Sequence, residues 1–525
     1  MINLPRTLAA VLLASLVTAA AAQDHPGHGN AEHAKRGEQG QRSDDETQRG
    51  AGPGSAGMGV LSLLPADSVT EHSIGTKAGT LAYTATAGTF PLFDQSGAQS
   101  ASVFYTAYVA KTENKTDNKT GNPSSRPVTF VFNGGPGAAS AFLNLGLVGP
   151  RIAEFGADGR DGSQTRLVDN PDTWLAFTDL VLIDPIGTGW SRAAKSDDSH
   201  VFWGVQADAD SMAKVIALYV AKNGRASSPK FILGESYGGF RAAKVARALQ
   251  EDQGIVVSGI LMVSPMLDGN FQFGGDHFAL GAALQLPSLA AAELERNGAF
   301  SSQALAQAEH FALTDYLTTL AGPPLQGDAA KAFYARVAKI TGVSEDALAR
   351  SRGFIRDDYI KNLAAEHKIV SHYDATFASD DPYPETPADR GPDPILDGMI
   401  RAYGGAFVGY ARDELGFKTE MTYNLLDGAI SRRWDWDRDR DQPSVMDDLR
   451  ELLALTPSFR LMIAHGYSDM VTPYAVTRYL LQHLPPLSGG PRTALKLYRG
   501  GHMFYLDPDS REAFTADART MYPPP

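Results

Sequence analysis

The chain of 525 residues is long enough to bury a large hydrophobic core, either in one large domain with an insertion or in several average domains. Hydrophobic residues make up 43% of it and charged residues 20%, which is typical of soluble globular proteins. The net charge of −13 disfavours nucleic acids and anionic membranes as partners. The absence of cysteine excludes disulfides, thiolate zinc sites and cysteine nucleophiles.

The first 22 residues have the pattern of a secretory signal peptide. Arg6 gives a positive start, residues 8–17 are apolar, and the alanines at 20–22 form a small-residue cleavage site. The apolar stretch is too short to span a bilayer comfortably, and no other segment of the sequence has the apolar length to do so. We therefore expect residues 1–22 to direct export to a periplasmic or extracellular location, without a membrane span.

Residues 23–59 are polar and rich in Gly, His, Gln and Arg. Such a segment cannot bury enough apolar surface to fold, so it is predicted to be a disordered linker. His25, His28 and His33 lie in it and would bind a metal only weakly, and a solvated linker explains them better. No metal and no cofactor is expected.

From residue 68 the sequence turns to β patterns. Strands are predicted at residues 68–74, 80–86, 103–110 and 128–132. The polar loop at 111–126 contains two N-glycosylation acceptor patterns, at Asn114 and Asn118, which matter only if the source glycosylates secreted proteins.

Strands and helices then alternate. Strands are predicted at 180–183, 231–233 and 256–263, and helices at 205–222 and 240–250. This rhythm predicts an α/β fold with a mostly parallel central sheet and helices on both of its faces.

The rhythm stops after Pro265. Residues 276–358 are mainly helical in pattern, and residues 380–394 are rich in Pro and Asp and predict a loop. The alternation resumes with helices at 446–454 and 473–483 and strands at 459–464 and 494–498. We therefore predict a first part of the core at 60–265, a largely helical cap insertion at 266–444 and a second part of the core at 445–525.

The run Gly-Glu-Ser-Tyr-Gly-Gly at residues 234–239 stands between a predicted strand and a predicted helix. A G-x-S-x-G turn in that place is the nucleophile elbow of α/β-hydrolases. A side chain at Gly234 or Gly238 would collide with the neighbouring strand or helix, and the serine must sit in a strained conformation with its hydroxyl exposed. The run therefore predicts the α/β-hydrolase fold, with Ser236 as its nucleophile.

A serine nucleophile needs a base, and the base needs an orienting carboxylate. In this fold the chain order is serine, acid, histidine, with the acid after a late strand and the histidine after the last strand. Asp469 and His502 occupy those places, so Ser236, Asp469 and His502 are the predicted catalytic set. His465 precedes the acid and is interpreted as a packing or loop residue, and Asp268 is the alternative acid.

The oxyanion of the reaction needs two backbone donors. One is predicted to be the amide of Tyr237, which follows the nucleophile. The other is expected from the Asn-Gly-Gly-Pro-Gly loop at 133–137, where glycine lets the backbone approach the substrate closely.

At this point the chain resembles the serine carboxypeptidase family. The shared motifs lie in the family's order at residues 133–137, 170–174 (Asn-Pro-Asp-Thr-Trp), 184–191 (Asp-Pro-Ile-Gly-Thr-Gly-Trp-Ser), 234–239, 466–469 and 501–503 (Gly-His-Met). They extend from the strand that begins at Val128 to Met503, which is the whole catalytic domain.

The resemblance implies a secreted α/β-hydrolase with a helical cap that removes residues one at a time from the free C-terminus of peptides. It implies an oxyanion hole formed by Gly135 and Tyr237. It also implies that Asn133, Gly134 and Glu235 bind the substrate, with a protonated Glu235 and the Asn133 amide holding its carboxylate.

The chain departs from the family at two informative positions. Val131 stands where the family commonly has tryptophan, and Leu147 stands where it commonly has a second glutamate. The catalytic chemistry is therefore better supported than the exopeptidase specificity. A secreted esterase or acyltransferase with the same triad is the alternative, and the intact Ser236, Asp469 and His502 argue against a catalytically dead binding protein.

Overall fold

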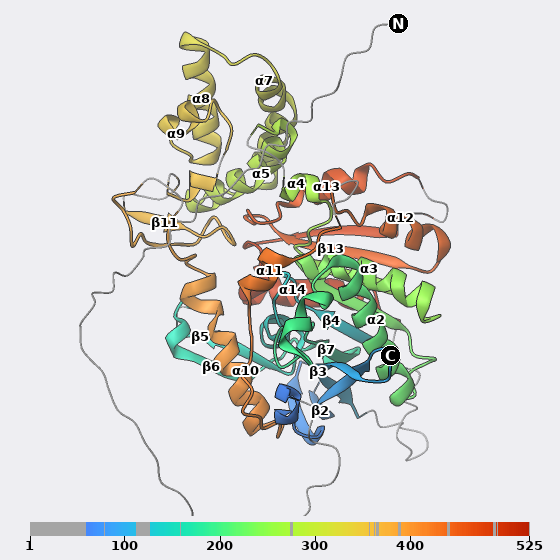
Figure 1. Ribbon diagram of the computed structural model, residues 1–525. Helices are drawn as coiled ribbons and strands as arrows, with labels where there is room; N and C mark the ends of the chain where they lie inside the picture. Colours follow the sequence, from blue (N-terminus) through green and yellow to red (C-terminus); the bar gives the residue numbers. More distant parts are fainter. Residues whose placement is uncertain are drawn as a thin grey trace, which may run out of the picture. The chain divides into compact units, whose positions relative to one another are not determined.

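A ten-stranded sheet organises the part of the chain that the computed structural model describes (Figure 1). That part comprises residues 59–77, 79–111, 126–157, 159–273, 277–355, 357–361, 363, 367–386, 390–437, 442–486, 490 and 492–523. The predicted signal peptide, nearly all of the predicted linker, and both glycosylation patterns lie outside these residues.

The strand order is β1-β2-β3-β7-β4-β9-β10-β13-β14, and the short β8 pairs with β3. Neighbouring strands are parallel along β7-β4-β9-β10-β13-β14, whereas β1, β2, β3 and β7 pair antiparallel in turn. The strands are β1 Ser68–Thr76, β2 Gly79–Phe93, β3 Gln99–Ala110, β4 Val128–Phe132, β7 Asp179–Ile183, β8 Arg192–Ala193, β9 Lys230–Glu235, β10 Gly259–Val263, β13 Arg460–Gly466 and β14 Thr493–Tyr498. The predicted mostly parallel sheet is confirmed.

Helices cover both faces of this sheet, because successive residues of a strand point to opposite sides. Phe130 and Phe132 of β4 pack in one core with α2, α3 and α12, whereas Val131 packs in the other core with α10 and α14. The helices are α1 Ala141–Leu143, α2 Val205–Lys222, α3 Tyr237–Asp252, α4 Gly269–Gln272, α5 Ala279–Arg296, α6 Ser302–Phe311, α7 Leu317–Ala321, α8 Gly327–Thr341, α9 Glu345–Arg350, α10 Ala402–Asp413, α11 Gly428–Arg433, α12 Met446–Leu455, α13 Tyr474–Gln482 and α14 Pro508–Arg519.

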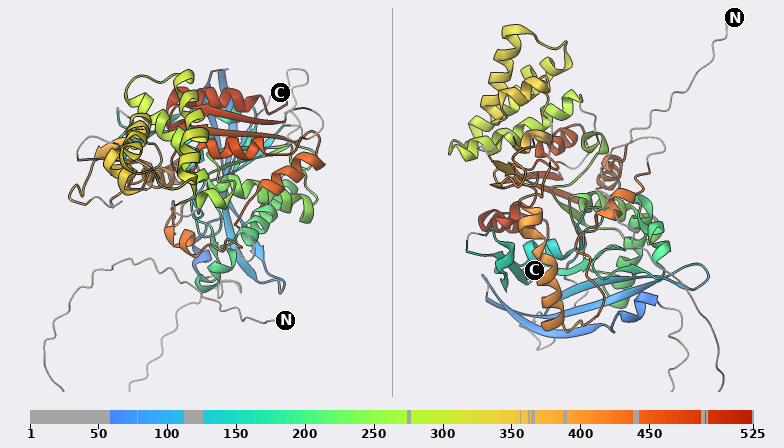
Figure 2. Two further views of the ribbon diagram at one scale, coloured as in Figure 1. Left: turned by 90° about the horizontal axis from the view of Figure 1, so that it is seen from above. Right: turned by 60° about the vertical axis from the view of Figure 1, so that its left-hand side comes forward.

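The chain between β10 and α12 leaves the sheet and returns beside its own exit. Asp268 and Ser444 form an antiparallel bridge, and the Val445 amide donates to the Leu267 carbonyl at 3.0 Å. Helices α5 to α9 gather into one helical group with a core of its own (Figures 1 and 2). By contrast, α10 packs in the core of the sheet, where Tyr403, Phe407 and Tyr410 are buried.

Several elements differ from the sequence-based expectation. Strand β2 runs on to Phe93, well beyond residue 86, because its outer half pairs with the first half of β3. Two hairpins were not predicted: β5 Arg151–Phe155 with β6 Thr165–Asp169, and β11 Lys368–Val370 with β12 Ala378–Asp380.

Among the described residues, no helix is long and apolar enough to cross a membrane.

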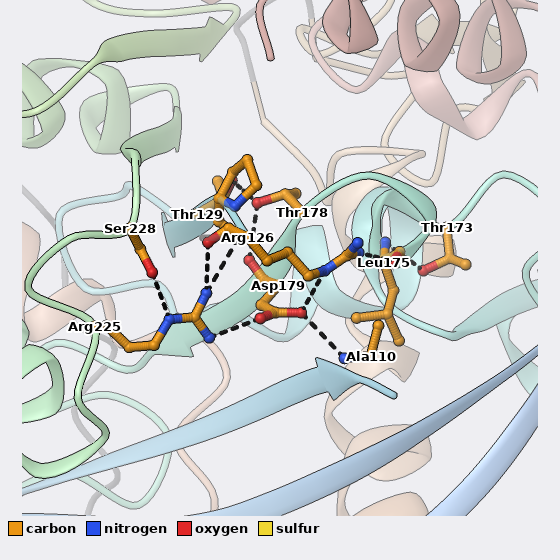
Figure 3. A network of polar contacts seen from close by, with 10 residues as sticks. Ala110, Arg126, Thr129, Thr173, Leu175, Thr178, Asp179, Arg225 and Ser228 are labelled. Carbon is orange, nitrogen blue, oxygen red and sulfur yellow. Dashed lines mark hydrogen bonds and ion pairs between the residues drawn. The ribbon is translucent and has the colours of Figure 1, made fainter. Parts of the chain in front are cut away.

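A buried ionic network joins the amino ends of three neighbouring strands (Figure 3). Asp179, the first residue of β7, accepts hydrogen bonds from Arg126 Nε at 2.8 Å, Arg225 Nη1 at 2.7 Å and the Ala110 amide at 3.0 Å. Arg225 also donates to the Arg126 carbonyl at 2.8 Å and to the Ser228 hydroxyl at 2.8 Å. The network fixes the chain where it enters β4, β7 and β9, which lie side by side in the sheet.

Candidate active site

Ser236 lies on a sharp turn between β9 and α3. Its φ of 59° and ψ of −126° are strained for a residue with a side chain, and the turn is held because the Ser236 amide donates to the Val263 carbonyl at 2.9 Å. A methyl group at Gly234 would collide with the Gly238 carbonyl, and one at Gly238 would lie 2.6 Å from the Phe132 carbonyl oxygen. The local geometry is that of a nucleophile elbow.

His502 and Asp469 form a buried pair on loops that follow β14 and β13. His502 Nδ1 lies 3.0 Å from Asp469 Oδ2, and both residues are almost wholly buried. The His502 amide donates to the Tyr373 carbonyl at 2.6 Å, and the Tyr373 ring packs edge-on against the imidazole at 5.4 Å. With Nδ1 engaged, Nε2 is the imidazole nitrogen left to act as a base.

Asp469 is held as a carboxylate by several donors. The amides of Val471 and Thr472 donate to its Oδ1 at 2.8 and 3.0 Å, and the Thr472 hydroxyl donates to its Oδ2 at 2.8 Å. Burial alone would raise the pKa of Asp469, but the positive charge and hydrogen bond of His502 outweigh it, so the pKa lies below its usual range. The same pair raises the pKa of His502 against the effect of burial.

The two rival residues of the sequence have other partners. His465, at the end of β13, is fully buried and its Nε2 pairs with the Thr477 hydroxyl at 2.8 Å. Burial lowers the pKa of His465, which favours its neutral form. Asp268 caps α4 by accepting the Asn270 amide at 2.9 Å.

The glycine loop at residues 133–137 lies directly over the elbow. A methyl group at Gly134 would come within 2.6 Å of the Tyr237 amide nitrogen, so only glycine allows this approach. Tyr237 is the first residue of α3, and its amide therefore has no acceptor within the helix. Gly135 has a φ of 101°, and a methyl group there would meet the Gly137 nitrogen at 2.6 Å.

Glu235 is buried immediately before the nucleophile, among donors that carry no charge. Its Oε2 accepts the Asn133 side-chain amide at 2.9 Å and the Tyr505 hydroxyl at 2.8 Å. Burial raises the pKa of Glu235 to about 7, which the nearby His502 charge and these hydrogen bonds only partly oppose. Near neutral pH this side chain therefore exchanges between acceptor and donor.

Three residues of this site were missed by sequence reasoning. Tyr505, whose hydroxyl donates to Glu235, could have been inferred from the sequence, because it follows His502 by only three residues. Thr472 and Arg241 carry no such signal. Arg241 of α3 pairs with buried Asp208 at 2.6 Å and donates to the Asn133 carbonyl, so it ties the elbow helix to the glycine loop.

The end of β10 links the serine turn to the imidazole, because the Ser236 amide donates to the Val263 carbonyl at 2.9 Å and the Ser264 hydroxyl donates to the His502 carbonyl at 2.7 Å. Leu147, the position of the absent second glutamate, is fully buried in the apolar core. Among the described residues, no group of three or more His, Asp or Glu side chains is arranged to hold a metal ion. The chemistry available to these side chains is nucleophilic acyl transfer.

The chain belongs to the serine carboxypeptidase family, whose model matches residues 91–493. That match contains Ser236 and Asp469 and ends before His502. The resemblance predicted from the motifs is thus confirmed. A search of curated protein sequences finds no match.

Among solved structures, the chain is similar to Kex1Δp, a prohormone-processing carboxypeptidase from Saccharomyces cerevisiae. The TM-score is 0.54 at 15% identity, over 84% of this chain and 91% of that chain. A proline iminopeptidase from Mycobacterium smegmatis gives a TM-score of 0.34 at 17% identity, over 83% of this chain and 96% of that one. The family match and the mostly parallel sheet with helices on both faces confirm the α/β-hydrolase fold predicted from the elbow.

Proposed function

We propose that this protein is an exported serine carboxypeptidase that releases C-terminal residues from peptides through an acyl-enzyme on Ser236. The proposal depends on the environment of Glu235. It is buried next to the nucleophile, bonded to Asn133, and able to keep its proton near neutral pH. A protonated carboxyl group can donate a hydrogen bond to a substrate carboxylate, which an endopeptidase or esterase does not require.

In the proposed reaction, Ser236 attacks the last peptide carbonyl while His502 takes its proton at Nε2 and passes it to the leaving amine. Asp469 stabilises the imidazolium that forms, and its pKa below the usual range keeps it ionised throughout. Water then attacks the acyl-enzyme with His502 as base, which regenerates Ser236.

The amides of Gly135 and Tyr237 are the proposed donors to the oxyanion. The closeness of the glycine loop to the Tyr237 nitrogen supports this pairing. Asn133, Gly134 and Glu235 are the proposed binders of the terminal carboxylate, and Glu235 directly precedes the nucleophile along the chain.

Two further expectations belong to the same proposal. Residues 266–444 are proposed as a cap over the site, a division supported by the bridge between Asp268 and Ser444. Residues 1–22 are proposed to direct export, with cleavage after Ala22. N-terminal sequencing of exported protein tests this, and Met1 retained in that protein would contradict it.

The second candidate is an esterase or acyltransferase on the same triad. Leu147 favours it, because an apolar residue there removes one of the acids that the family commonly uses. The deciding experiment compares a blocked dipeptide with its C-terminal amide. We expect the free acid to be cleaved with the higher kcat/KM below pH 7, and equal cleavage of both at every pH would favour the second candidate.

A further inference from the structure

The loop of the β11–β12 hairpin (Figure 1), residues 371–377, lies against both loops that carry the proposed catalytic pair. This strap belongs to the segment inserted between β10 and α12. On one side, the His502 amide donates to the Tyr373 carbonyl at 2.6 Å. A methyl group at Gly501 would collide with that carbonyl oxygen and would lie 2.6 Å from Asp374 Cα, so glycine at this position lets the strap come close to His502.

On its other side, the strap holds the residues that flank Asp469. The Ala375 amide donates to the Ser468 carbonyl at 3.1 Å. The Met470 amide donates to the His372 carbonyl at 3.2 Å. Ser468 and Met470 directly precede and follow Asp469 in the chain. The strap therefore fixes the backbone on both sides of the acid that orients the imidazole.

One side chain of the strap, that of Asp374, also reaches the loop of Asp469. Its Oδ1 accepts the Ser468 hydroxyl at 2.7 Å, the Thr376 amide at 2.9 Å and the Thr376 hydroxyl at 2.7 Å. Ser468 has no exposed surface, so Asp374 supplies the acceptor that this buried hydroxyl requires. Asp374 thus joins the strap to the residue before Asp469 by a side-chain hydrogen bond as well.

Helix α5 of the helical group is bonded to the strap and to the His502 loop. Arg296, the last residue of α5, donates through Nη1 to the Ala375 carbonyl at 2.6 Å. Its neighbour Glu295 pairs with Arg499, three residues before His502, at 2.5 Å. The Arg499 side chain is 74% exposed and that of Arg296 only 23%, so solvent weakens the direct link more than the link through the strap.

We propose that the strap holds Asp469 and His502 in their productive geometry, and that Asp374 is a positioning residue that acts through the Ser468 hydroxyl. The inference deepens the proposed function, because it takes the same catalytic set. Under it the inserted segment supports the catalytic pair directly, in addition to its proposed place as a cap. A displacement of a catalytic group by about 1 Å can cost roughly 100-fold in rate, so a loosened strap should be measurable.

The first test measures how fast a fluorophosphonate labels Ser236, because that reaction needs the base but no peptide substrate. Asp374→Ala should be labelled roughly 10–100-fold more slowly than the wild-type protein. Asp374→Asn should keep most of the rate, because all three hydrogen bonds use Oδ1 and an amide oxygen can accept them. Equal rates for Asp374→Ala and the wild-type protein would overturn the proposal.

A double-mutant cycle tests whether Asp374 acts through Ser468. Ser468→Ala removes the other partner of their hydrogen bond, so adding it to Asp374→Ala should slow labelling by less than about twofold more. Effects of the two changes that multiply in full would refute the route through Ser468.

Tyr316→Phe is the matched control for lost stability. It removes the buried hydrogen bond from the Tyr316 hydroxyl to the Gly353 carbonyl, in the helical group and outside the strap. It should lower the thermal midpoint but leave the labelling rate at the wild-type value. Slower labelling of this variant, by as much as that of Asp374→Ala, would attribute the effect to general destabilisation and overturn the proposal.

The pKa of His502 gives a readout that does not depend on catalysis. Burial lowers this pKa, and the Asp469 charge more than offsets that effect, so a looser pair in Asp374→Ala should bring it down. Titration of the imidazole signals by NMR measures it, with the His502 signal assigned by its absence from His502→Ala. A His502 pKa that is the same in Asp374→Ala and the wild-type protein would refute the positioning role.

The two readouts separate this proposal from the proposed function. If Asp374→Ala lowers the pKa of His502 but the wild-type protein cleaves no blocked dipeptide, the strap stands and the carboxypeptidase function fails. If the wild-type protein cleaves the dipeptide, and Asp374→Ala matches it in labelling rate and in the pKa of His502, the function stands and the strap proposal fails.

Discussion

Each end of the parallel sheet holds a buried carboxyl group, Asp179 at the amino ends of the strands and Glu235 at the carboxyl ends. The two groups differ in the charge of their hydrogen-bond donors. At the amino ends, Asp179 faces two guanidinium groups, Arg126 and Arg225, and a backbone amide (Figure 3). At the carboxyl ends, Glu235 accepts hydrogen bonds from neutral donors, the Asn133 side-chain amide and the Tyr505 hydroxyl.

Charged donors are typical of a buried acid that stabilises the fold, and neutral donors are typical of one that takes up and releases a proton. Charge-assisted bonds to two arginines compensate a carboxylate fully, and they also cross-link three strands. Neutral donors stabilise a buried carboxylate incompletely, so burial raises the pKa of Glu235 to about 7. The first arrangement should affect folding, and the second should affect pH-dependent activity.

The largest expected effect is the loss of kcat in variants at the carboxyl ends of the parallel strands. Ser236→Ala, Asp469→Asn and His502→Ala should each lower kcat by on the order of 10⁴–10⁶, and the losses should not add because the three act as one unit. Each variant should still fold, which circular dichroism checks. Steady-state kinetics on a blocked dipeptide measures this.

His465→Gln serves as the control for the catalytic set, because His465 lies near Asp469 but bonds Thr477. It should retain most of the activity. Loss of activity in Asp268→Asn with an active Asp469→Asn would show that the wrong acid was chosen.

The amino ends should show the reverse pattern. Asp179→Ala leaves the buried guanidinium group of Arg225 and the partly buried one of Arg126 without their shared carboxylate. The loss should lower the free energy of unfolding by about 3–5 kcal/mol, while kcat/KM of the folded protein stays near the wild-type value. Urea unfolding followed by circular dichroism measures the loss.

The exposed pair of Asp169 and Arg151 gives the matched control. Asp169→Ala should cost less than about 1 kcal/mol, because solvent screens that pair. Equal losses from Asp179→Ala and Asp169→Ala would show that the buried network does not hold the sheet as argued.

Backbone geometry at the carboxyl ends should matter for turnover. Gly135→Ala forces a methyl group against the Gly137 nitrogen and moves the amide proposed for the oxyanion, which should lower kcat by about 10²–10³. Gly97→Ala has a similar positive φ of 81° but open space around it, and should leave kcat unchanged. An effect of Gly135→Ala on KM alone would count against the oxyanion role.

The parts of this comparison differ in how well the sequence predicts them. Strand β4 was predicted with its observed bounds, Val128–Phe132, because three of its five residues are β-branched and the other two are aromatic. The elbow was predictable because its glycines and serine form a short motif between a predicted strand and a predicted helix. Both signals are confined to a few neighbouring residues.

Contacts between segments that lie far apart in the chain could not be predicted from the sequence. The Asp179 network needs the strand order of the sheet, and nothing local marks Arg225 as a partner of Asp179, 46 residues away. Likewise Tyr403 reaches the surroundings of Glu235 only because α10, from the inserted segment, packs in the core of the sheet. Loops that pack by tertiary contacts carry no periodicity that would reveal them.

The smallest expected effect concerns the proton on Glu235. In the proposed function, recognition of the substrate carboxylate requires a protonated Glu235, and proton transfer requires a neutral His502, whose pKa is raised. With a blocked dipeptide, wild-type kcat/KM should therefore be bell-shaped in pH, and above about pH 7 it should fall roughly tenfold per pH unit.

Glu235→Gln keeps a donor at every pH, so it should remove the alkaline limb and leave the acid limb that belongs to His502. The C-terminal amide of the same dipeptide should lack the alkaline limb even with the wild-type protein.

The stability of the fold supplies an independent readout of the Glu235 pKa. Because the folded-state pKa lies above the ordinary value of 4.5, the contribution of Glu235 is fully present below that value and is lost as pH rises through 7. The free energy of unfolding of the wild type, relative to Glu235→Gln, should therefore decline across this window. An alkaline limb that persists in Glu235→Gln would assign it to another group and remove the contrast between the two ends of the sheet.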